Sequence, residues 1–261
     1  MTLMQITLDY TKTLEQNAAM LYEKAKKARK KRQGAEASLK RTEEQLEKGV
    51  ALQKKTELAK ERKRPWYDHF HWFISSEDFL VIGGRDATTN EIIVKKQTAQ
   101  GDFVFHSELA GSPFFVVKAE GKKIGEITKT EAAIATASYS RAWRQGLTTM
   151  EVFAVAPDQL SKTPQSGEYI SKGSFIVRGR KERFMVSLQL ALGVYREGIM
   201  AGPLSAVSRH CSRLIEIAPG KEKSGKAAKL IQKRIGGELD DIIRGIPAGG
   251  VQVKGVRLRE I

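Results

Sequence analysis

The stretch FLVIGGRDATTNEIIV, residues 79–94, carries the local pattern that sets the fold of the globular part of this chain. Its first four residues are apolar and predict a strand, and the two glycines that follow permit a tight turn. Asp86 is suited to cap a helix that runs from Ala87 to about Gln97. The turn matches neither a G-x-x-x-x-G-K nor a G-x-G-x-x-G phosphate loop, so we expect a capped helix start, with Arg85 beside it as a candidate phosphate ligand.

Further helices and strands are predicted along the rest of this part. Thr128 and Glu131 form the S/T-x-x-E signature of a capping box, which predicts a helix from Thr128 to about Gln145. A further helix is expected over 227–235. We expect an α+β fold: a mixed, largely antiparallel sheet with packed helices, preceded by a long basic coiled-coil helix. The remaining strands are predicted at 103–106, 114–118, 149–156, 174–180, 183–192 and 212–217.

The composition limits the classes of protein to which this chain can belong. The chain has 261 residues, of which 41% are hydrophobic, enough to form a core. No apolar stretch approaches the ~20 residues of a transmembrane helix, and the first residues lack the pattern of a signal peptide. Cys211 is the single cysteine, so no intrachain disulfide can form and a reducing cytoplasm is expected.

The charge is strongly positive and unevenly distributed. The net charge is +15, and residues 11–64 hold 17 Lys/Arg against 8 Asp/Glu, a net of +9. A polyanion is the expected partner of such a chain, and in a cytoplasm that is most often nucleic acid. Residues 24–32, KAKKARKKR, have seven basic positions in nine and no acidic one, which favours contact with a phosphate backbone over an ordinary solvated helix face.

The first 64 residues predict an extended arm. Residues 5–9 alternate polar and apolar, so a short strand is expected within 1–10. Thr11 or Thr13 can then cap a helix, and 11–64 form a basic coiled-coil arm. The helix needs a partner: the chain folded back, a second copy in a homodimer, or another polypeptide. The seam follows 4-3 spacing at Leu14, Ala18, Leu21, Ala25, Ala28, Arg32, Ala35, Leu39, Thr42 and Leu46.

Pro65 ends the arm, and an aromatic segment opens the globular part, 65–261. His69 and His71 could begin a metal site, but only two other histidines exist and no cysteine pair accompanies them, so we expect no metal and no cofactor. Packing of the arm onto the core by these aromatics is expected, with base stacking by an exposed Trp66 as the alternative.

Further basic side chains are expected to line an RNA surface on the globular part. One group ends the predicted helix at 141–144, and another follows the long 157–173 loop. With those of 24–32 and Arg85, the candidate RNA-binding residues are Lys24, Lys26, Lys27, Arg29, Lys30, Lys31, Arg32, Arg85, Arg141, Trp143, Arg144, Lys172, Arg178, Arg180 and Lys181.

No catalytic arrangement can be identified. Residues 220–227, GKEKSGKA, fit G-x-x-x-x-G-K, but Ala227 replaces the Ser/Thr that would hold magnesium, and too few residues follow for a nucleotide-binding sheet. We therefore interpret this segment as a basic loop. No spacing of Ser, His and Asp singles out a triad, so no catalytic residues are assigned.

Several segments resemble the RNA-binding domain at the C-terminal end of NFACT proteins, which are ribosome-associated quality-control factors. The resemblance covers about residues 65–250, and the 157–180 signature is its most specific part. In addition, LEQNAAMLYEKAKKARKK (14–31) resembles the second strand of that family's long coiled coil. The segments are WFISSEDFLVIGGRDATTNEIIVKK (72–96), SYSRAW (138–143), PDQLSKTPQSGEYISKGSFIVRGR (157–180) and IAPGKEKSGKAAK (217–229).

The resemblance implies a function without catalysis. Members of the family bind a large ribosomal subunit that still holds stalled peptidyl-tRNA, recruit tRNA, and in many cases direct C-terminal tailing of the stalled chain. The implied partners are therefore large-subunit rRNA and tRNA, in the cytoplasm and away from membranes. Peptidyl transfer belongs to the ribosome, so the resemblance implies that this chain is not an enzyme.

Two departures from the family pattern affect these expectations. Full-length members begin with a tRNA-contacting domain, a helix-hairpin-helix domain and the outgoing coiled-coil helix, which are lacking here, so we expect a natural half or an engineered fragment whose missing part can be a separate polypeptide. Where the family has His-Ala-Asp and His-Gly-Ala, this chain has His106-Ser-Glu108 and Ala110-Gly111-Ser112.

Two rival functions stay open at this point. A tRNA-modifying enzyme could use Asp86, His106 or Glu108, and their convergence in one deep pocket would favour it. A general nucleic-acid-binding protein acting apart from ribosomes would bind in a salt-sensitive way without preference for ribosomal particles.

Overall fold

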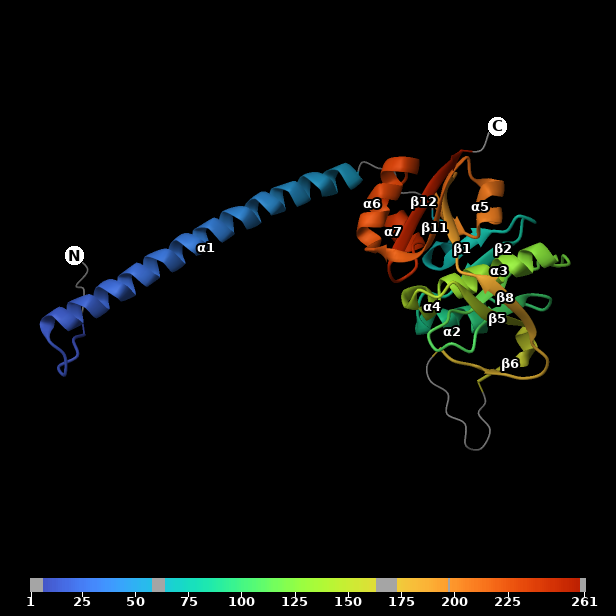
Figure 1. Ribbon diagram of the computed structural model, residues 1–261, viewed down its shortest axis with the longest axis horizontal. Coiled ribbons are helices and arrows are strands. Elements are labelled where there is room, and N and C mark those ends of the chain that lie inside the picture. Colours follow the sequence, from blue (N-terminus) through green and yellow to red (C-terminus); the bar gives the residue numbers. More distant parts are fainter. Residues whose placement is uncertain (1–6, 58–63, 163–172, 197, 259–261) are drawn as a thin grey trace, which may run out of the picture. The chain divides into compact units, whose positions relative to one another are not determined.

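The computed structural model describes residues 7–57, 64–162, 173–196 and 198–258. The chain divides into two compact units, residues 1–64 and 65–261, and each is described by itself. Figure 1 shows the first unit as one long helix and the second as a globular α+β domain. The α+β class, with a long N-terminal helix, is confirmed.

The first unit consists mainly of α1, Leu14–Glu57. Thr13 caps its start, as one of the two predicted caps: the Thr13 Oγ1 accepts from the Gln16 N–H at 3.3 Å, and the Gln16 Oε1 accepts from the Thr13 N–H at 3.1 Å. This reciprocal pair satisfies two backbone donors at the helix start.

The strand predicted at residues 5–9 is wrong in its described part, because residues 7–9 form no strand. The Asp9 N–H donates to Asn17 Oδ1 at 2.8 Å, and Asn17 Nδ2 donates to the Asp9 carbonyl at 2.9 Å. A side chain of the helix thus satisfies the backbone that a strand partner would otherwise bind. Residues 5 and 6 lie outside the described part of the chain.

The apolar seam of α1 is open to solvent. Leu14 is 74% exposed and Leu39 is 64% exposed, and among the described residues nothing packs against the seam. A helix this polar is not stable alone in water, so pairing as a coiled coil stays a prediction with its partner unassigned.

The globular unit contains two antiparallel sheets and a short ribbon. The first sheet has six strands in the order β1-β2-β4-β3-β5-β8. The second has the order β10-β9-β11-β12, and β6 pairs with β7. The strands are β1 His71–Ile74, β2 Leu80–Gly83, β3 Phe103–His106, β4 Phe115–Val117, β5 Thr149–Val155, β6 Leu160–Ser161, β7 Ile176–Val177, β8 Glu182–Ser187, β9 Leu190–Tyr195, β10 Gly198–Gly202, β11 Arg213–Glu222 and β12 Val251–Leu258.

Helices connect and cover these strands. Figure 1 shows α6 and α7 beside β11 and β12, and α3 runs along the first sheet. The helical segments are η1 Trp66–His69, α2 Ala87–Lys96, α3 Glu126–Ser138, α4 Arg141–Gln145, η2 Pro157–Gln159, α5 Leu204–His210, α6 Ser224–Ile235 and α7 Leu239–Gly245.

The strand–turn–helix predicted for 79–94 is confirmed as β2 and α2. Asp86 is the N-cap, and its Oδ1 accepts from the Thr89 N–H at 2.8 Å. Asn90 closes the turn because its Oδ1 accepts from the Phe114 N–H at 3.0 Å. A Cβ on Gly84 would lie 1.9 Å from that oxygen, so only glycine fits there.

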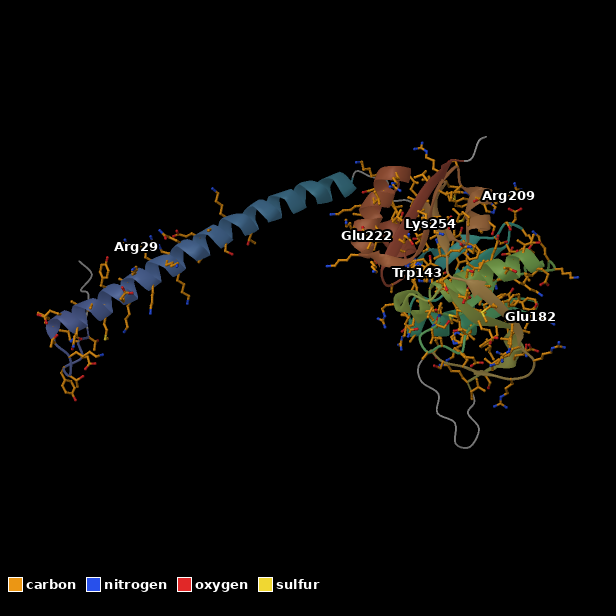
Figure 2. The ribbon with its side chains drawn as sticks, in the orientation of Figure 1. Arg29, Trp143, Glu182, Arg209, Glu222 and Lys254 are labelled. Carbon is orange, nitrogen blue, oxygen red and sulfur yellow. The ribbon has the colours of Figure 1, made fainter. Side chains whose placement is uncertain are left out.

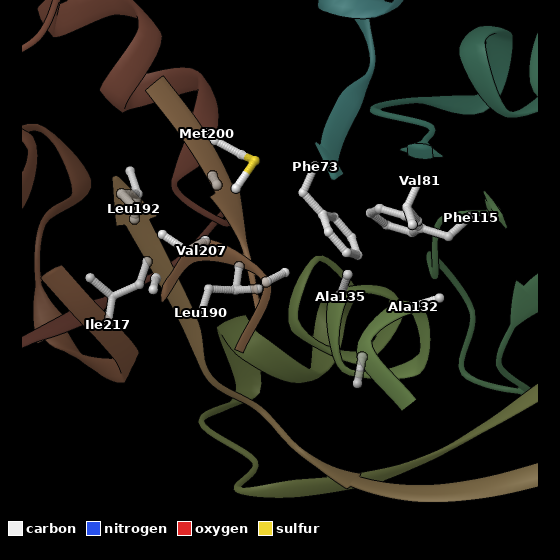
Figure 3. Packing of buried hydrophobic residues seen from close by; sticks show 14 of the residues in the cluster. Phe73, Val81, Phe115, Ala132, Ala135, Leu190, Leu192, Met200, Val207 and Ile217 are labelled. Atoms are coloured by element: carbon white, nitrogen blue, oxygen red, sulfur yellow. The ribbon is translucent and has the colours of Figure 1, made fainter. Parts of the chain in front are cut away.

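One hydrophobic core joins the two sheets. α3 presents Ala132, Ala133 and Ala135, all fully buried, so that the helix approaches the sheets closely. Figure 3 shows Phe73 and Phe115 on the first sheet and Leu190 and Met200 on the second within this same cluster.

Two boundaries differ from the sequence expectation because of long-range contacts. α3 begins at Glu126, not at Thr128, since the Glu77 carboxylate accepts from the Thr128 N–H at 2.9 Å and from its hydroxyl at 2.6 Å. The helix also ends at Ser138, and Ser140 caps the separate α4.

The predicted strand 183–192 is two strands, because β8 ends at Ser187 and β9 begins at Leu190. The chain passes from the first sheet to the second between them. Three strands, β6, β10 and β12, were missed: the first has only two residues, the second is short and bounded by glycines, and the third is interrupted by Gly255.

We predict that Glu77→Gln lowers the free energy of unfolding by about 1 kcal/mol, because the charged cap of α3 is replaced by a weaker neutral acceptor. Urea denaturation measures this. Glu120→Gln, at an exposed glutamate in a turn, is the matched control and should leave the midpoint unchanged. Equal midpoints for both variants would contradict the capping role.

Candidate nucleic-acid interface

The basic segment 24–32 lies within α1, and every side chain in it is exposed. Figure 2 labels Arg29 on this segment. At ~100° per residue, the seven cations point in all directions around the helix axis. A partner helix on the seam would therefore cover only part of this charge, and the rest would remain available to a polyanion.

Few carboxylates neutralise this segment. Lys26 lies 4.0 Å from Glu23 and Arg32 lies 3.4 Å from Glu36, both at exposed positions where ion pairs contribute little. Within the part of the chain that the structure describes, the other five form no ion pair: Lys24, Lys27, Arg29, Lys30 and Lys31.

Arg85 is half-buried and its guanidinium is bound within the fold, which gives no support to its predicted role in RNA binding. Its guanidinium donates to the Arg244 carbonyl at 3.0 Å and to the Phe70 carbonyl at 2.9 Å, and its Nε is buried. Burial lowers the pKa of the guanidinium below its usual value. Arg85 thus links α7 to the residue before β1, because its side chain points into the fold and its guanidinium donates to carbonyls of both segments.

His71 lies beside this network. Its ring stacks on Tyr139 with centroids 3.8 Å apart, and its Nδ1 is buried without a hydrogen-bond partner among the described residues. Burial, followed by the nearby charges of Arg85 and Arg244, holds the pKa of His71 well below 6.5. The metal site considered for His69 and His71 has no geometric support, since His69 lies in η1 and not in the same strand.

We predict that His71 makes the chain less stable in mild acid. Its pKa is about 6.5 when unfolded and lower when folded, so the unfolded chain binds more protons and the free energy of unfolding falls as the pH drops below 6.5. The loss approaches about 1.4 kcal/mol per pH unit. His71→Phe should flatten this slope in urea denaturation between pH 7 and 5, and identical slopes for both proteins would contradict it.

Trp143 is a core residue, contrary to its predicted role in RNA binding. It is 1% exposed, and its Nε1 donates to the Gly250 carbonyl at 3.0 Å. The indole therefore fastens α4 to the loop before β12. Sequence reasoning placed it at the surface because it lies between two arginines, which do point outward.

We predict that Trp143→Phe lowers the free energy of unfolding by about 2–4 kcal/mol, because a buried hydrogen bond is lost and a small cavity is left. RNA affinity of the folded protein should be unchanged. Urea denaturation and fluorescence anisotropy with a labelled RNA stem-loop measure the two properties. Weaker RNA binding at unchanged stability would restore a direct role for this side chain.

Arg141 and Arg144, which flank Trp143, are both exposed on α4. A Cβ on Gly249 would lie 2.9 Å from the Cα of Arg144, and the Ser224 hydroxyl donates to the Gly249 carbonyl at 2.9 Å. The end of α4 and the start of α6 therefore meet at this glycine, far apart as they are in sequence.

The cluster predicted at 172–183 is partly neutralised. Arg178 and Arg180 are exposed, and Gln159 Nε2 fixes their backbone by donating to both carbonyls at 2.8 and 2.9 Å. Lys181 instead pairs with Glu108 at 2.6 Å and lies 4.3 Å from the centre of the Phe153 ring. Lys172 lies outside the described residues.

The three candidates for an enzyme have structural roles. Asp86 caps α2. His106 Nδ1 lies 3.0 Å from the Pro113 carbonyl, its ring stacks on Phe114 at 3.9 Å, and burial lowers its pKa. Glu108 pairs with Lys181, which lowers the pKa of that carboxyl. No contact in the described part of the chain brings all three into one site.

Two other kinds of site find no support in the described ranges. No group of three or more His, Cys, Asp or Glu residues there is placed to hold a metal ion. No described helix combines the length and apolar character needed to cross a bilayer.

One basic element was missed by sequence reasoning. The segment 220–227, interpreted as a basic loop, is the end of β11 and the first turn of α6. The signal for a helix starting at Ser224 was the apolar spacing of Ala227, Ala228, Ile231 and Ile235, all buried. Its other face is basic.

Comparison with known proteins gives a family match within the globular unit. Residues 69–179 match the family model described as the NFACT protein RNA binding domain. The resemblance found in the sequence is thereby confirmed over that range.

Two curated relatives match most of this chain but only part of their own length. The chain is 37% identical over 217 residues to the archaeal Rqc2 homolog aRqcH of Methanocaldococcus jannaschii, covering 80% of this chain and 32% of the relative. It is 40% identical over 171 residues to the ribosome quality control complex subunit NEMF of Homo sapiens, covering 65% of this chain and 16% of the relative. The chain thus spans about a third or less of these relatives.

Proposed function

We propose that this chain is an RNA-binding component of ribosome-associated quality control. It binds the large ribosomal subunit that holds a stalled peptidyl-tRNA and supports C-terminal tailing of the stalled chain. The observation that carries the proposal is the match of residues 69–179 to the NFACT protein RNA binding domain, together with a relative that is named as a ribosome quality control complex subunit.

The charge distribution supports a phosphate-rich partner. The cations of 24–32 are exposed around α1, and Arg141, Arg144, Arg178 and Arg180 are exposed on the globular unit. Cations that neutralise phosphates release condensed counterions, which favours binding to rRNA or tRNA without base readout.

The roles of the chain in this process follow from these features. We propose that it acts without catalysis, and the structural contacts of Asp86, His106 and Glu108 support this. The open seam of α1 accepts a second helix, from a separate polypeptide with the family's N-terminal domains or from a second copy in a homodimer. The location is the cytoplasm, where ribosomes carry out translation.

We predict that Lys26, Lys27, Lys30 and Lys31, all changed to Glu, abolish co-sedimentation of the chain with large ribosomal subunits at moderate salt. The four changes alter the local charge by eight units, because each +1 becomes −1, and the phosphate backbone then repels the helix. Sedimentation through a sucrose cushion measures the bound fraction.

The matched control changes the same four lysines to arginine, which keeps the charge and the helix propensity. It should sediment like the wild type. Unchanged sedimentation of the glutamate variant would remove the arm from the interface. Equal binding of the wild type to unrelated RNA and to large subunits would instead favour a general nucleic-acid-binding protein.

A further inference from the structure

Most of the excess positive charge of the globular unit comes from one short segment. Residues 65–261 hold 28 Lys/Arg against 21 Asp/Glu, a net of +7. Residues 221–234 alone hold six Lys/Arg and one Asp/Glu, a net of +5. This segment, the end of β11 and almost all of α6, lies outside the range matched by the RNA-binding domain model.

One face of α6 is buried and apolar, and the other is exposed and basic. Ala227, Ala228, Ile231 and Ile235 are at most 1% exposed and pack the helix against the second sheet and α7. The opposite face is solvent-exposed and basic, so the apolar face fixes the direction in which the lysines point. The exposed cations of the segment are Lys221, Lys223, Lys226, Lys229, Lys233 and Arg234.

Three of these lysines form a stripe. Lys226, Lys229 and Lys233 are three and four positions apart, so they lie within ~60° of one another and span ~10 Å along the helix axis. Nucleic-acid strands place phosphates every ~3.4 Å along a duplex axis, so a stripe of this length can contact several phosphates of one strand.

This stripe is not balanced by acidic side chains. Lys226 pairs with Glu222 at 2.9 Å, with both side chains largely in water. Within the described ranges, Lys221, Lys223, Lys229 and Lys233 form no ion pair. By contrast, several cations around the first sheet do have carboxylates: Lys95 and Lys162 share Glu91, at 2.7 Å each.

The surface extends beyond α6 itself. Gly249 contacts both Arg144 at the end of α4 and Ser224 at the start of α6, so the exposed Arg144 lies beside the first turn of α6. The positive end of the helix macrodipole points to the same place. The fold thus joins the predicted arginines of α4, within the matched domain, to a basic helix outside it.

We propose that Lys226, Lys229 and Lys233 of α6, with Arg144 beside them, form a second RNA-backbone contact surface of the globular unit. It binds phosphates by charge and not by base readout. This inference rests on the proposed RNA-binding function and adds a site to it.

The test uses the full chain and a labelled RNA stem-loop, with affinity measured by fluorescence anisotropy over a series of salt concentrations. Lys226, Lys229 and Lys233 are changed together to Gln. We expect the affinity to fall about tenfold and the slope of log K against log salt to decrease by about 2–3, because about three phosphate contacts are lost.

The matched control changes Lys96, Lys122 and Lys123 to Gln, three exposed lysines that remove the same charge from within the matched domain. It should change the slope by much less. Circular dichroism confirms that both variants are folded, as expected for changes at exposed positions.

Each remaining outcome has a definite meaning. Equal slopes for the two variants would overturn the α6 surface while leaving RNA binding intact. If the α6 variant loses binding to phosphatidylserine vesicles and not to RNA, the surface serves a membrane and the inference is wrong. If the wild type binds neither the stem-loop nor large subunits, the proposed function itself fails.

Discussion

The close packing of α3 against two sheets is the constraint on which the globular unit depends. Its alanine face has no bulk, so the helix backbone reaches strands of both sheets and joins them in one core. Glu131, also buried on α3, accepts from the Ser76 N–H at 2.9 Å and from the Ser205 hydroxyl, which ties the helix to the β1–β2 turn and to α5. The outer helices, α4 and α6 among them, take their positions from this core.

That rigid core determines which cations can reach a polyanion. Around the first sheet, several lysines are held by carboxylates, as Lys129 is by Glu182 at 3.2 Å. On α1 and α6 the cations have few acidic neighbours and lie on surfaces that the apolar residues leave open. A phosphate-binding surface is therefore expected where several unneutralised cations gather on one helix, as on α1 and α6, and not at scattered exposed lysines.

The sequence predicted the elements set by local chemistry. The turn and cap at 83–86 followed from two glycines and Asp86, and the long helix followed from its 4-3 spacing. The sequence prediction failed where residues far apart in the chain interact. Glu77 accepts a hydrogen bond at the start of α3, which begins earlier than predicted, and the Gly250 carbonyl accepts one from the buried Trp143. Arg85 was misplaced for the same reason, since the carbonyls that bind it come from Phe70 and Arg244. The basic face of α6 was not predicted, because residues 220–227 fit a phosphate-loop pattern and were interpreted as a loop.

Lysine acetylation mapped by mass spectrometry, with and without bound large ribosomal subunits, tests the central claim most directly. The account predicts protection of the lysines within 24–31 and of Lys226, Lys229 and Lys233, because bound phosphates shield exposed ammonium groups. Lys96, Lys122 and Lys123 should react equally in both states. Uniform reactivity, or protection confined to these last three, would contradict the claim that uncompensated cations on α1 and α6 make the contact.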